Sequence, residues 1–150
     1  MSDTDETQNN IRHEQANNVH VGDFLLINGF PCKVVNLTKS KTGKHGGCKI
    51  HFVGLDIFTQ KKYDTIYKSG DNVAVPIISK CDYTLVDISD DDPAFLSLID
   101  NAHTMREDTK LPDNELGNKI KEEFKNRHNI IVTVLKSMDR EMIISYKIDK

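Results

Sequence analysis

Lysine and glycine residues are concentrated in one short stretch of the chain, residues 39–49, which reads KSKTGKHGGCK. It holds four lysines (Lys39, Lys41, Lys44 and Lys49) and three glycines within eleven residues. Each lysine carries an ammonium group on a flexible stem, so a cluster of them suits contact with a phosphate backbone. Taken alone, the same composition also suits an ordinary solvated loop, and both interpretations stay open at this point.

Two chemical motifs can be compared with this stretch and its surroundings. A phosphate-binding P-loop needs a glycine five residues before the Gly43-Lys44 pair and a serine or threonine after it. Thr38 and His45 occupy those positions, so the P-loop is excluded. No serine, histidine and aspartate form a recognisable nucleophile motif, and the acidic run 90–92 is typical of a solvated turn. We therefore predict no catalytic residues and a protein that is not an enzyme.

Three potential metal ligands, His45, Cys48 and His51, follow one another at intervals of three residues. Residues three apart on a β-strand point to opposite faces, so Cys48 and His51 cannot easily share a metal ion. No Cys-x-x-Cys pair supplies further ligands. We expect no metal site and interpret Cys48 as a small core residue.

Hydrophobic runs flank the lysine stretch on both sides, at residues 31–38 and 49–53. Two such runs around a glycine-rich polar tip predict a β-hairpin. Gly43 and Gly46 bracket the residues between them and permit positive φ on either side. The predicted hairpin therefore presents Lys44 at its tip.

The composition is that of a chain with modest cores and a charged surface. Its 150 residues are 37% hydrophobic and 29% charged and include no tryptophan, which suits one domain or two small ones. No apolar run approaches the roughly 18 residues that a membrane span requires. The acidic N-terminus is unlike a secretion signal, and three cysteines do not suit a disulfide framework. We expect a cytosolic protein with no membrane span.

Charge is distributed unevenly along the chain. Residues 20–79 hold eight lysines against four aspartates, a net charge of +4. Residues 1–19 have a net charge of −3, and residues 80–150 hold eleven Lys or Arg against fifteen acidic residues. The basic middle segment predicts a polyanionic partner for that segment.

The first two segments differ in their capacity to form a core. Residues 1–19 are polar and acidic with a single isoleucine, so we predict a disordered tail. Residues 20–79 hold five or six short hydrophobic runs separated by turn signals, which predict a small β-barrel. Asn28-Gly29 is the pair that best suits a type I′ turn between two of these strands.

A new pattern begins in the C-terminal segment, residues 80–150, after a predicted linker at Ser79-Lys80. Three short strand patterns come first. Hydrophobic residues at intervals of four then predict a helix over residues 113–127, and two further strands follow. The order β-β-β-α-β-β is that of an OB barrel.

The amino-acid sequences of several segments resemble those of one known family. Residues 41–46, KTGKHG, closely resemble the hypusine-site loop of the eukaryotic and archaeal translation factor five-A family, relatives of bacterial elongation factor P. The resemblance spans about residues 21–148 and implies an all-β fold, an SH3-like barrel followed by an OB-fold barrel with one helix. Four further segments match the family's pattern: 31–35 (PCKVV), 49–63, 95–98 (FLSL) and 106–112 (REDTKLP).

By this resemblance, Lys44 is the residue converted to hypusine. Deoxyhypusine synthase would transfer an aminobutyl group from spermidine to Lys44, and deoxyhypusine hydroxylase would complete the modification. The protein itself is expected to need no cofactor, since hypusine is a covalent modification. Lys39 and Lys49 would contact RNA phosphates. The residues implied to support the loop and to contact the modifying enzymes or tRNA are Lys41, Thr42, Gly43, His45 and Gly46.

The resemblance also implies an RNA-binding factor of protein synthesis, named in that family for initiation or elongation and also active in termination. Such a factor binds the 80S ribosome between the P and E sites. There the modified lysine reaches the acceptor end of peptidyl-tRNA and promotes peptide-bond formation at stalled sites such as proline runs. The expected location is the cytoplasm, and a nuclear pool and a weak homodimer are left open.

Two positions depart from the family's pattern, because Gly47 and Cys48 stand where a second histidine and an alanine are common. Gly47 removes an imidazole and loosens the loop, so we expect an effect on the efficiency of modification and none on the identity of the lysine. Two functions of other classes are the alternatives. One is a general RNA-binding or chaperone-like module without modification, and the other is an enzyme on a small β scaffold.

Overall fold

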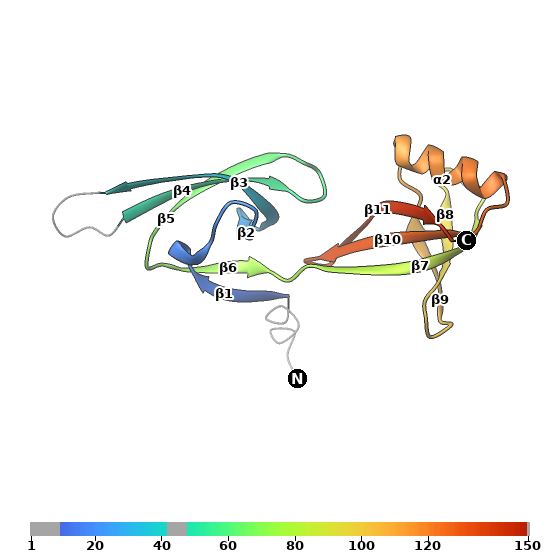
Figure 1. Ribbon diagram of the computed structural model, residues 1–150, viewed down its shortest axis with the longest axis horizontal. Helices are drawn as coiled ribbons and strands as arrows, with labels where there is room; N and C mark the ends of the chain where they lie inside the picture. Colours follow the sequence, from blue (N-terminus) through green and yellow to red (C-terminus); the bar gives the residue numbers. More distant parts are fainter. Residues whose placement is uncertain (1–9, 42–47, 150) are drawn as a thin grey trace. The chain divides into compact units, whose positions relative to one another are not determined.

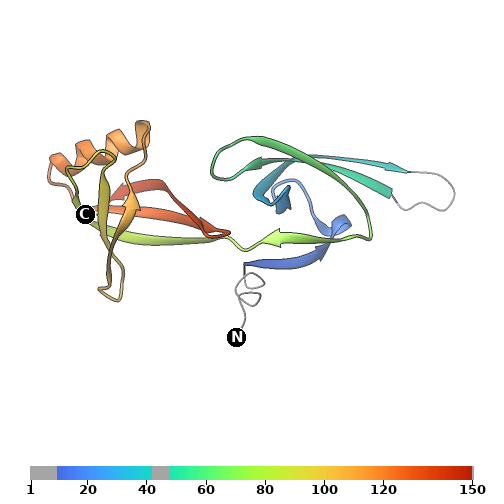
Figure 2. The same cartoon turned by 180° about the vertical axis from the view of Figure 1, so that it is seen from behind.

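The computed structural model describes residues 10–41 and 48–149, and the chain divides between Ile77 and Ile78 into two compact units. Figure 1 shows that both units are built mainly from β-strands, and Figure 2 shows the same strands from behind. No helix in the described part of the chain is long and apolar enough to cross a membrane. The predicted fold class, an SH3-like barrel followed by an OB-fold barrel with one helix, is confirmed.

The first unit contains a four-stranded antiparallel sheet in the order β2-β3-β4-β5 and a two-stranded sheet of β1 and β6. Short turns join β2 to β3 and β4 to β5, and such turns favour antiparallel neighbours. The elements of this unit are β1 (Ile11–Gln15), the 3₁₀ helix η1 (Ala16–Asn18), β2 (Phe24–Ile27), β3 (Phe30–Lys41), β4 (Cys48–Asp56), β5 (Lys62–Lys68) and β6 (Asn72–Pro76).

Two tight turns fix the ends of these strands. Asn28 and Gly29 have φ values of 53° and 83°, and positive φ at both positions is what the predicted type I′ turn requires. After β4, Gln60 also has a positive φ of 66°. The buried carboxylate of Asp56 accepts a hydrogen bond of 2.7 Å from the backbone N–H of Phe58 in this second turn.

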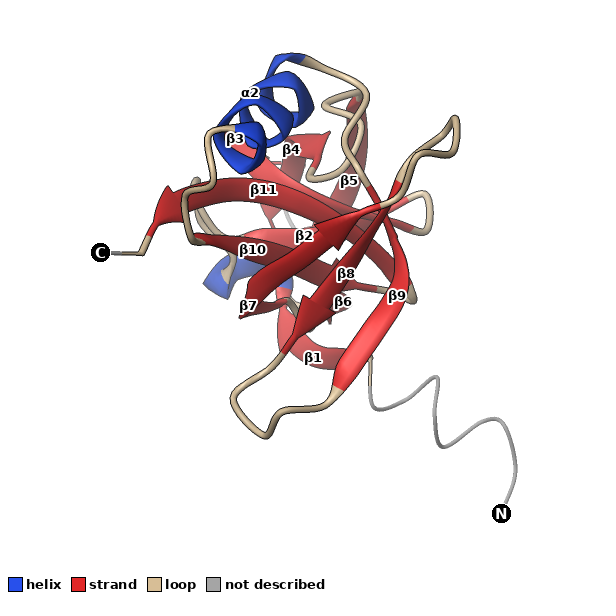
Figure 3. Ribbon diagram, turned by 90° about the vertical axis from the view of Figure 1, so that its right-hand side faces the viewer, coloured by secondary structure: helices blue, strands red, loops and turns tan. Residues whose placement is uncertain are grey.

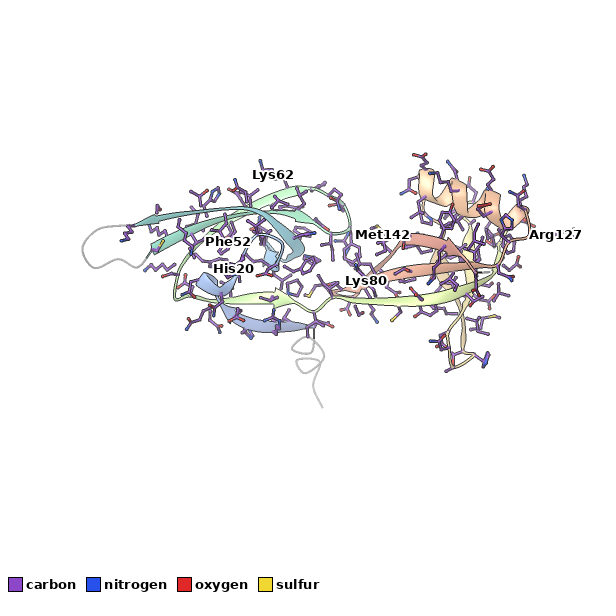
Figure 4. The ribbon with its side chains drawn as sticks, viewed as in Figure 1. His20, Phe52, Lys62, Lys80, Arg127 and Met142 are labelled. Carbon is purple, nitrogen blue, oxygen red and sulfur yellow. The ribbon has the colours of Figure 1, made fainter. Side chains whose placement is uncertain are left out.

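Alternate residues of β4 face the core of the first unit. Ile50 and Phe52 are fully buried, whereas Lys49 is exposed, as the period of two in a strand requires. In Figure 4, Phe52 lies on the inner side of the sheet and Lys62 points away from it. The buried residues of this core are Ala16, Val19, Leu25, Ile27, Cys32, Val34, Ile50, Phe52 and Val73.

The N-terminal segment corrects one prediction. Residues 11–15 form β1, which pairs with β6 from Ile11↔Pro76 to Gln15↔Asn72, and Ala16 is fully buried. The prediction of a disordered tail to residue 19 is therefore wrong for residues 10–19, and residues 1–9 lie outside the described part. The backbone of this segment is held by hydrogen bonds to β6. Its polar side chains gave no sign of a strand, because this pairing does not depend on them.

The second unit is a five-stranded antiparallel sheet in the order β11-β10-β7-β8-β9, with the helix α2 between β9 and β10, as predicted for an OB barrel. Figure 3 shows α2 in blue beside the red strands. The elements are β7 (Ser79–Ile88), β8 (Phe95–Ile99), β9 (Met105–Lys110), α2 (Glu115–Lys125), β10 (Ile130–Ser137) and β11 (Arg140–Ile148). Its buried core residues are Leu85, Leu96, Leu98, Ile120, Ile130, Val132, Val134 and Ile143.

Ser79 and Lys80 are part of a strand, so the predicted linker at this position is wrong. They begin β7 and pair with Lys136 and Leu135 of β10. Polar exposed side chains made these residues resemble a linker, but the hydrogen bonds of the sheet are made by the backbone. The chain passes from one unit to the other two residues earlier.

Helix α2 lies within the predicted range 113–127 and is shorter at both ends. Ile120 is fully buried, and Leu116 and Phe124 pack against the same core, so the four-residue spacing identified the buried face correctly. Asn114 caps the helix, since its side-chain oxygen accepts a hydrogen bond of 3.1 Å from the Gly117 N–H.

The two edge strands of the second sheet, β9 and β11, are joined by a side-chain ion pair. Both terminal nitrogens of Arg106 donate to the carboxylate oxygens of Glu141 at 2.8 Å, and its Nε donates to Asp108 at 2.8 Å. The guanidinium carbon lies 5.7 Å from the centroid of the Tyr83 ring. These hydrogen bonds lower the pKa of both carboxyl groups and raise that of Arg106. Arg106 thus links the two edge strands of the sheet through side-chain hydrogen bonds.

Candidate functional site

The β3–β4 hairpin carries the predicted site. Lys41 and Cys48 form its last described cross-strand pair, so segment 42–47 connects two fixed strand ends. The Ser69 N–H donates to the carbonyl oxygen of Cys48 at 2.8 Å, which also ties the start of β4 to the end of β5. The predicted modification site Lys44 and four predicted loop residues lie outside the described residues, namely Thr42, Gly43, His45 and Gly46.

A β-bulge in β3 decides which side of the sheet each residue of the hairpin occupies. Val34 pairs with Gly54 and Asn36 pairs with Val53, so the register steps over Val35. Beyond the bulge, Leu37 packs against the core. An extra residue in one strand shifts every later side chain to the other face. Because of the bulge, the side chain of Leu37 points toward the core.

The predicted lysines lie on two sides of the hairpin. Lys39 pairs with Ile50 and Lys41 pairs with Cys48, so both lie on the side that faces the core, although both are exposed. Lys49 comes between Cys48 and Ile50 and lies on the outer side. The two residues predicted to contact RNA phosphates, Lys39 and Lys49, therefore face in opposite directions.

Lys68 lies directly across from Lys49 in β5, and the sequence pattern did not point to it. Both side chains are exposed on the outer side of the sheet. The alternation of exposure along β5 places Lys62, Asp64, Ile66 and Lys68 on this side. That period could be read from the sequence, but only the register between strands shows which residue of β4 stands opposite.

His51 lies on the outer side of the hairpin and is bound to Asp64. Its Nε2 lies 2.8 Å from the Asp64 Oδ2, between side chains that are 40% and 65% exposed. Thr38 and Ile66 flank His51 on the neighbouring strands. Cys48 belongs to the opposite side, as predicted, so these two potential metal ligands are separated by the sheet.

Two observations bear on the chemistry of the potential nucleophiles and metal ligands in the described part of the chain. Burial, and then the charge of Asp56, raises the pKa of the Cys32 thiol to about 11, so this cysteine is a neutral thiol near pH 7. Within residues 10–41 and 48–149, no three His, Cys, Asp or Glu side chains are grouped closely enough to hold a metal ion. The third member of the predicted ligand series, His45, lies outside these ranges.

Two family models match consecutive parts of the chain. One, described as "Translation initiation factor 5A-like, N-terminal", matches residues 10–71. The other, described as "Eukaryotic elongation factor 5A hypusine, DNA-binding OB fold", matches residues 77–147. The two matches fall on the two compact units of the structure.

Individual proteins match over nearly the same range. Eukaryotic translation initiation factor 5A of Spodoptera exigua is 42% identical over 133 residues, which are 89% of this chain and 82% of that protein. Factor 5A-3 of Arabidopsis thaliana is 42% identical over 135 residues, 89% of this chain and 84% of that protein.

Two solved structures have a similar fold. A translation initiation factor eif-5a family protein from Naegleria fowleri matches with a TM-score of 0.84 and 35% identity, covering 92% of this chain and 99% of that one. Factor 5A from Methanococcus jannaschii, at 23% identity, shares the fold with a TM-score of 0.70 over 92% of this chain and 96% of that one.

Proposed function

Because this chain belongs to the translation initiation factor 5A family, we propose that it is a ribosome-binding factor whose functional group is hypusine formed on Lys44. It is a factor of translation, and the proposal adds where and how it acts. It binds the 80S ribosome between the P and E sites in the cytoplasm, contacts peptidyl-tRNA, and promotes elongation and termination. Its effect is greatest where peptide-bond formation stalls, as at proline runs.

The observation that carries this proposal is the place of Lys44 in a hairpin of a chain that matches the family over both units. The antiparallel pair Lys41↔Cys48 holds the two ends of the six-residue segment that contains Lys44. The long strands β3 and β4 support these ends through ladder hydrogen bonds, which makes a stable base for a reactive side chain.

The chemistry of the modification suits a probe of a narrow RNA-walled channel. Deoxyhypusine synthase transfers the aminobutyl group of spermidine to the Lys44 Nζ, so that a C–N bond of spermidine breaks and 1,3-diaminopropane leaves. The hydroxylase then converts one C–H bond of the added chain to C–OH, with molecular oxygen as the oxidant. The product is longer than lysine and carries a second amine, so it stays cationic. A thin cationic chain reaches tRNA phosphates that a barrel cannot approach and holds the acceptor end in a productive geometry. In this proposal the protein positions the substrate and the ribosome supplies the catalysis.

Mass spectrometry of the protein from its native host tests the modification. We expect the intact mass to include the aminobutyl and hydroxyl groups, and peptide mapping to locate both on Lys44. Lysine elsewhere in the stretch, such as Lys41, serves as the internal control and should be unmodified. A population in which every Lys44 is unmodified would overturn the proposal.

Replacement of Lys44 tests the function itself. K44R keeps a positive charge, but arginine does not accept the aminobutyl group, so we expect loss of stimulation of peptide-bond formation on a proline-rich message. K61R is the matched control, because Lys61 is an exposed lysine of the same unit with no proposed role, and it should keep most of the activity. If K44R were as active as the wild type, Lys44 would contribute charge alone.

A further inference from the structure

The two edge strands of the second unit, β9 and β11, enclose a cavity. Its volume is about 350 Å³, and its walls are formed by residues 108–112 and 141–143. At one end of the gap, Arg106 reaches across from β9 to bind Glu141 of β11. Sites for small ligands begin at about this volume. The gap between the two strands is therefore a candidate binding site, and the proposed function makes no use of it.

The direction of the two edge strands suits an added strand between them. β9 is joined to β7 through the antiparallel strand β8, and β11 is joined to β7 through the antiparallel strand β10. Both edge strands therefore run in the same direction as β7. One extended segment in the gap can be antiparallel to both and can pair with each through the same kind of ladder.

On the β9 side, backbone groups of Lys110 point into the gap. The Leu111 N–H donates to the carbonyl oxygen of Ala94 at 3.0 Å, in continuation of the pairing between β8 and β9. Hydrogen-bonded and non-hydrogen-bonded pairs alternate along an antiparallel ladder. The N–H and C=O of Lys110, the next residue, therefore point away from β8 and toward the open edge.

On the β11 side, the same argument applies to Glu141 and Ile143. Ser137 and Arg140 flank a two-residue turn in which both residues have positive φ, and such flanking residues form a hydrogen-bonded pair. The alternation then directs the backbone groups of Glu141 and Ile143 away from β10. Unpaired edges of this kind are templates for an additional strand.

The side chain of Thr109 gives independent support for a ligand in the gap. Thr109 is 7% exposed and lines the cavity, and its Oγ1 has no hydrogen-bond partner among the described residues. A buried hydroxyl without a partner is costly. Rotation about χ1 exchanges the hydroxyl and methyl groups, and strands accommodate more than one χ1 position. A polar group in the cavity can therefore supply the missing hydrogen bond.

The walls of the cavity and the charge of the unit indicate the kind of ligand. Leu111, Pro112 and Ile143 provide an apolar surface that suits one apolar side chain. Residues 80–150 hold eleven Lys or Arg against fifteen acidic residues, a net charge of −4. This charge repels a phosphate backbone and attracts a cationic ligand.

We propose that the gap between β9 and β11 binds an extended peptide as an added strand, with one apolar side chain in the cavity and basic residues at its ends. The peptide backbone pairs with the free edge groups of Lys110, Glu141 and Ile143, and a polar group of the peptide is the partner of Thr109. This inference goes beyond the proposed function and does not depend on Lys44.

Three heptapeptides of equal charge test the proposal by NMR titration of the isotope-labelled full-length protein. KKTVTKK is the probe, KKTGTKK lacks the apolar side chain, and KKPVPKK lacks two backbone N–H groups. We expect KKTVTKK to shift the signals of residues 108–112 and 141–143. KKTGTKK should bind about tenfold more weakly, and KKPVPKK should cause no measurable shift.

Two substitutions of threonine by valine test the role of the buried hydroxyl. T109V keeps the shape of the side chain, and we expect it to bind KKTVTKK about fivefold more weakly. T84V makes the same change at an exposed position of β7 and should bind as the wild type does. Thermal unfolding is the folding control, since T109V removes an unsatisfied group and should unfold at no lower temperature than the wild type.

Four results would overturn the proposal. Equal affinity for the three peptides, or no binding of KKTVTKK, would show that charge alone acts or that the gap takes no peptide. Undiminished binding by T109V would remove the role of the hydroxyl. Displacement of KKTVTKK by oligouridine from residues 108–112 would assign the site to a nucleic acid. Signals of these residues that move with protein concentration in the absence of peptide would assign it to a second copy of the chain.

Discussion

At the level of single residues, the contact between Arg106 and Glu141 shows how one side chain joins two strands that share no hydrogen-bond ladder. Both terminal nitrogens of the arginine bind the carboxylate, and the two side chains are 23% and 30% exposed. Bidentate pairs of this kind are stronger than single contacts and fix geometry. The hydrogen bonds from Arg106 lower the pKa of Glu141 below its ordinary value of 4.5.

The lowered pKa of Glu141 makes the stability of the fold depend on pH. A carboxyl group whose pKa is lower in the folded protein stabilises the fold above its unfolded pKa, and this stabilisation is lost as the pH falls through the folded value. We expect E141Q to lower the free energy of unfolding by about 1 kcal/mol near pH 7. Below pH 4.5, the difference between E141Q and the wild type should shrink.

Chemical denaturation at a series of pH values measures this effect. E107Q is the matched control, since it removes the same charge from β9, the strand of Arg106, where Glu107 accepts a 3.3 Å hydrogen bond from Ser97. A difference between E141Q and the wild type that stays constant with pH would contradict the assignment of the ion pair.

At the level of elements, helix α2 depends on a glycine that its helical pattern alone would not favour. Gly117 lies in the first turn and is buried, and a Cβ atom at this position would overlap the carbonyl oxygen of Pro112. Glycine inside a helix normally costs about 1 kcal/mol relative to alanine. Here the close approach of the chain before the helix reverses that preference.

Two substitutions in this helix distinguish the effect of helix propensity from the effect of side-chain packing. We expect G117A to lower the free energy of unfolding by about 1–3 kcal/mol, because the added methyl group overpacks the turn. N118A at the exposed neighbouring position should be neutral or stabilising by a few tenths of a kcal/mol. Urea unfolding of both variants measures this, and a stabilised G117A would show that the turn before α2 moves freely.

The sequence predicted best those elements in which hydrophobic side chains are buried and polar side chains are exposed. The buried face of α2 follows from its four-residue spacing, and β8 (Phe95–Ile99) coincides with a short hydrophobic run. Strand β1 was missed because its residues are mostly polar and its stability comes from pairing with β6. A partner strand that is distant in sequence leaves no local signal.

At the candidate site, too, features that depend on neighbouring residues in the sequence were predicted, and features that depend on pairing between strands were not. The lysine stretch predicted a hairpin with Lys44 between its strands, and β3 and β4 confirm the hairpin while the role of Lys44 stays a prediction. The pairing of Lys49 with Lys68 could not be predicted, since it depends on the register of β4 against β5. Period alone places a residue on a side of the sheet and leaves its neighbours unknown.

At the level of the whole molecule, the chain holds two cores made from different residues. The first core includes Ile50 and the second includes Ile120, and both side chains are fully buried. No residue is shared between the two core clusters among the described residues. Separate cores of this size predict separate cooperative units.

A matched pair of truncations tests this organisation in the full-length protein. I50A and I120A each remove the same atoms from a fully buried site, and each should cost about 2–5 kcal/mol. We expect I50A to speed amide hydrogen exchange within residues 10–77 alone and I120A within 78–149 alone. Faster exchange throughout the chain in either variant would show that the units unfold together.

The bulge at Val35 has a consequence for how the whole first unit divides its charge. Counted along β3, Lys33, Lys39 and Lys41 have the same parity and in an unbroken strand would share one face with Lys49. The one-residue phase shift at Val35 inverts the parity of everything that follows it. Without the bulge, the lysines of β3 and β4 would form one densely charged surface. With it, they are divided between two surfaces of lower charge density on opposite sides of the sheet.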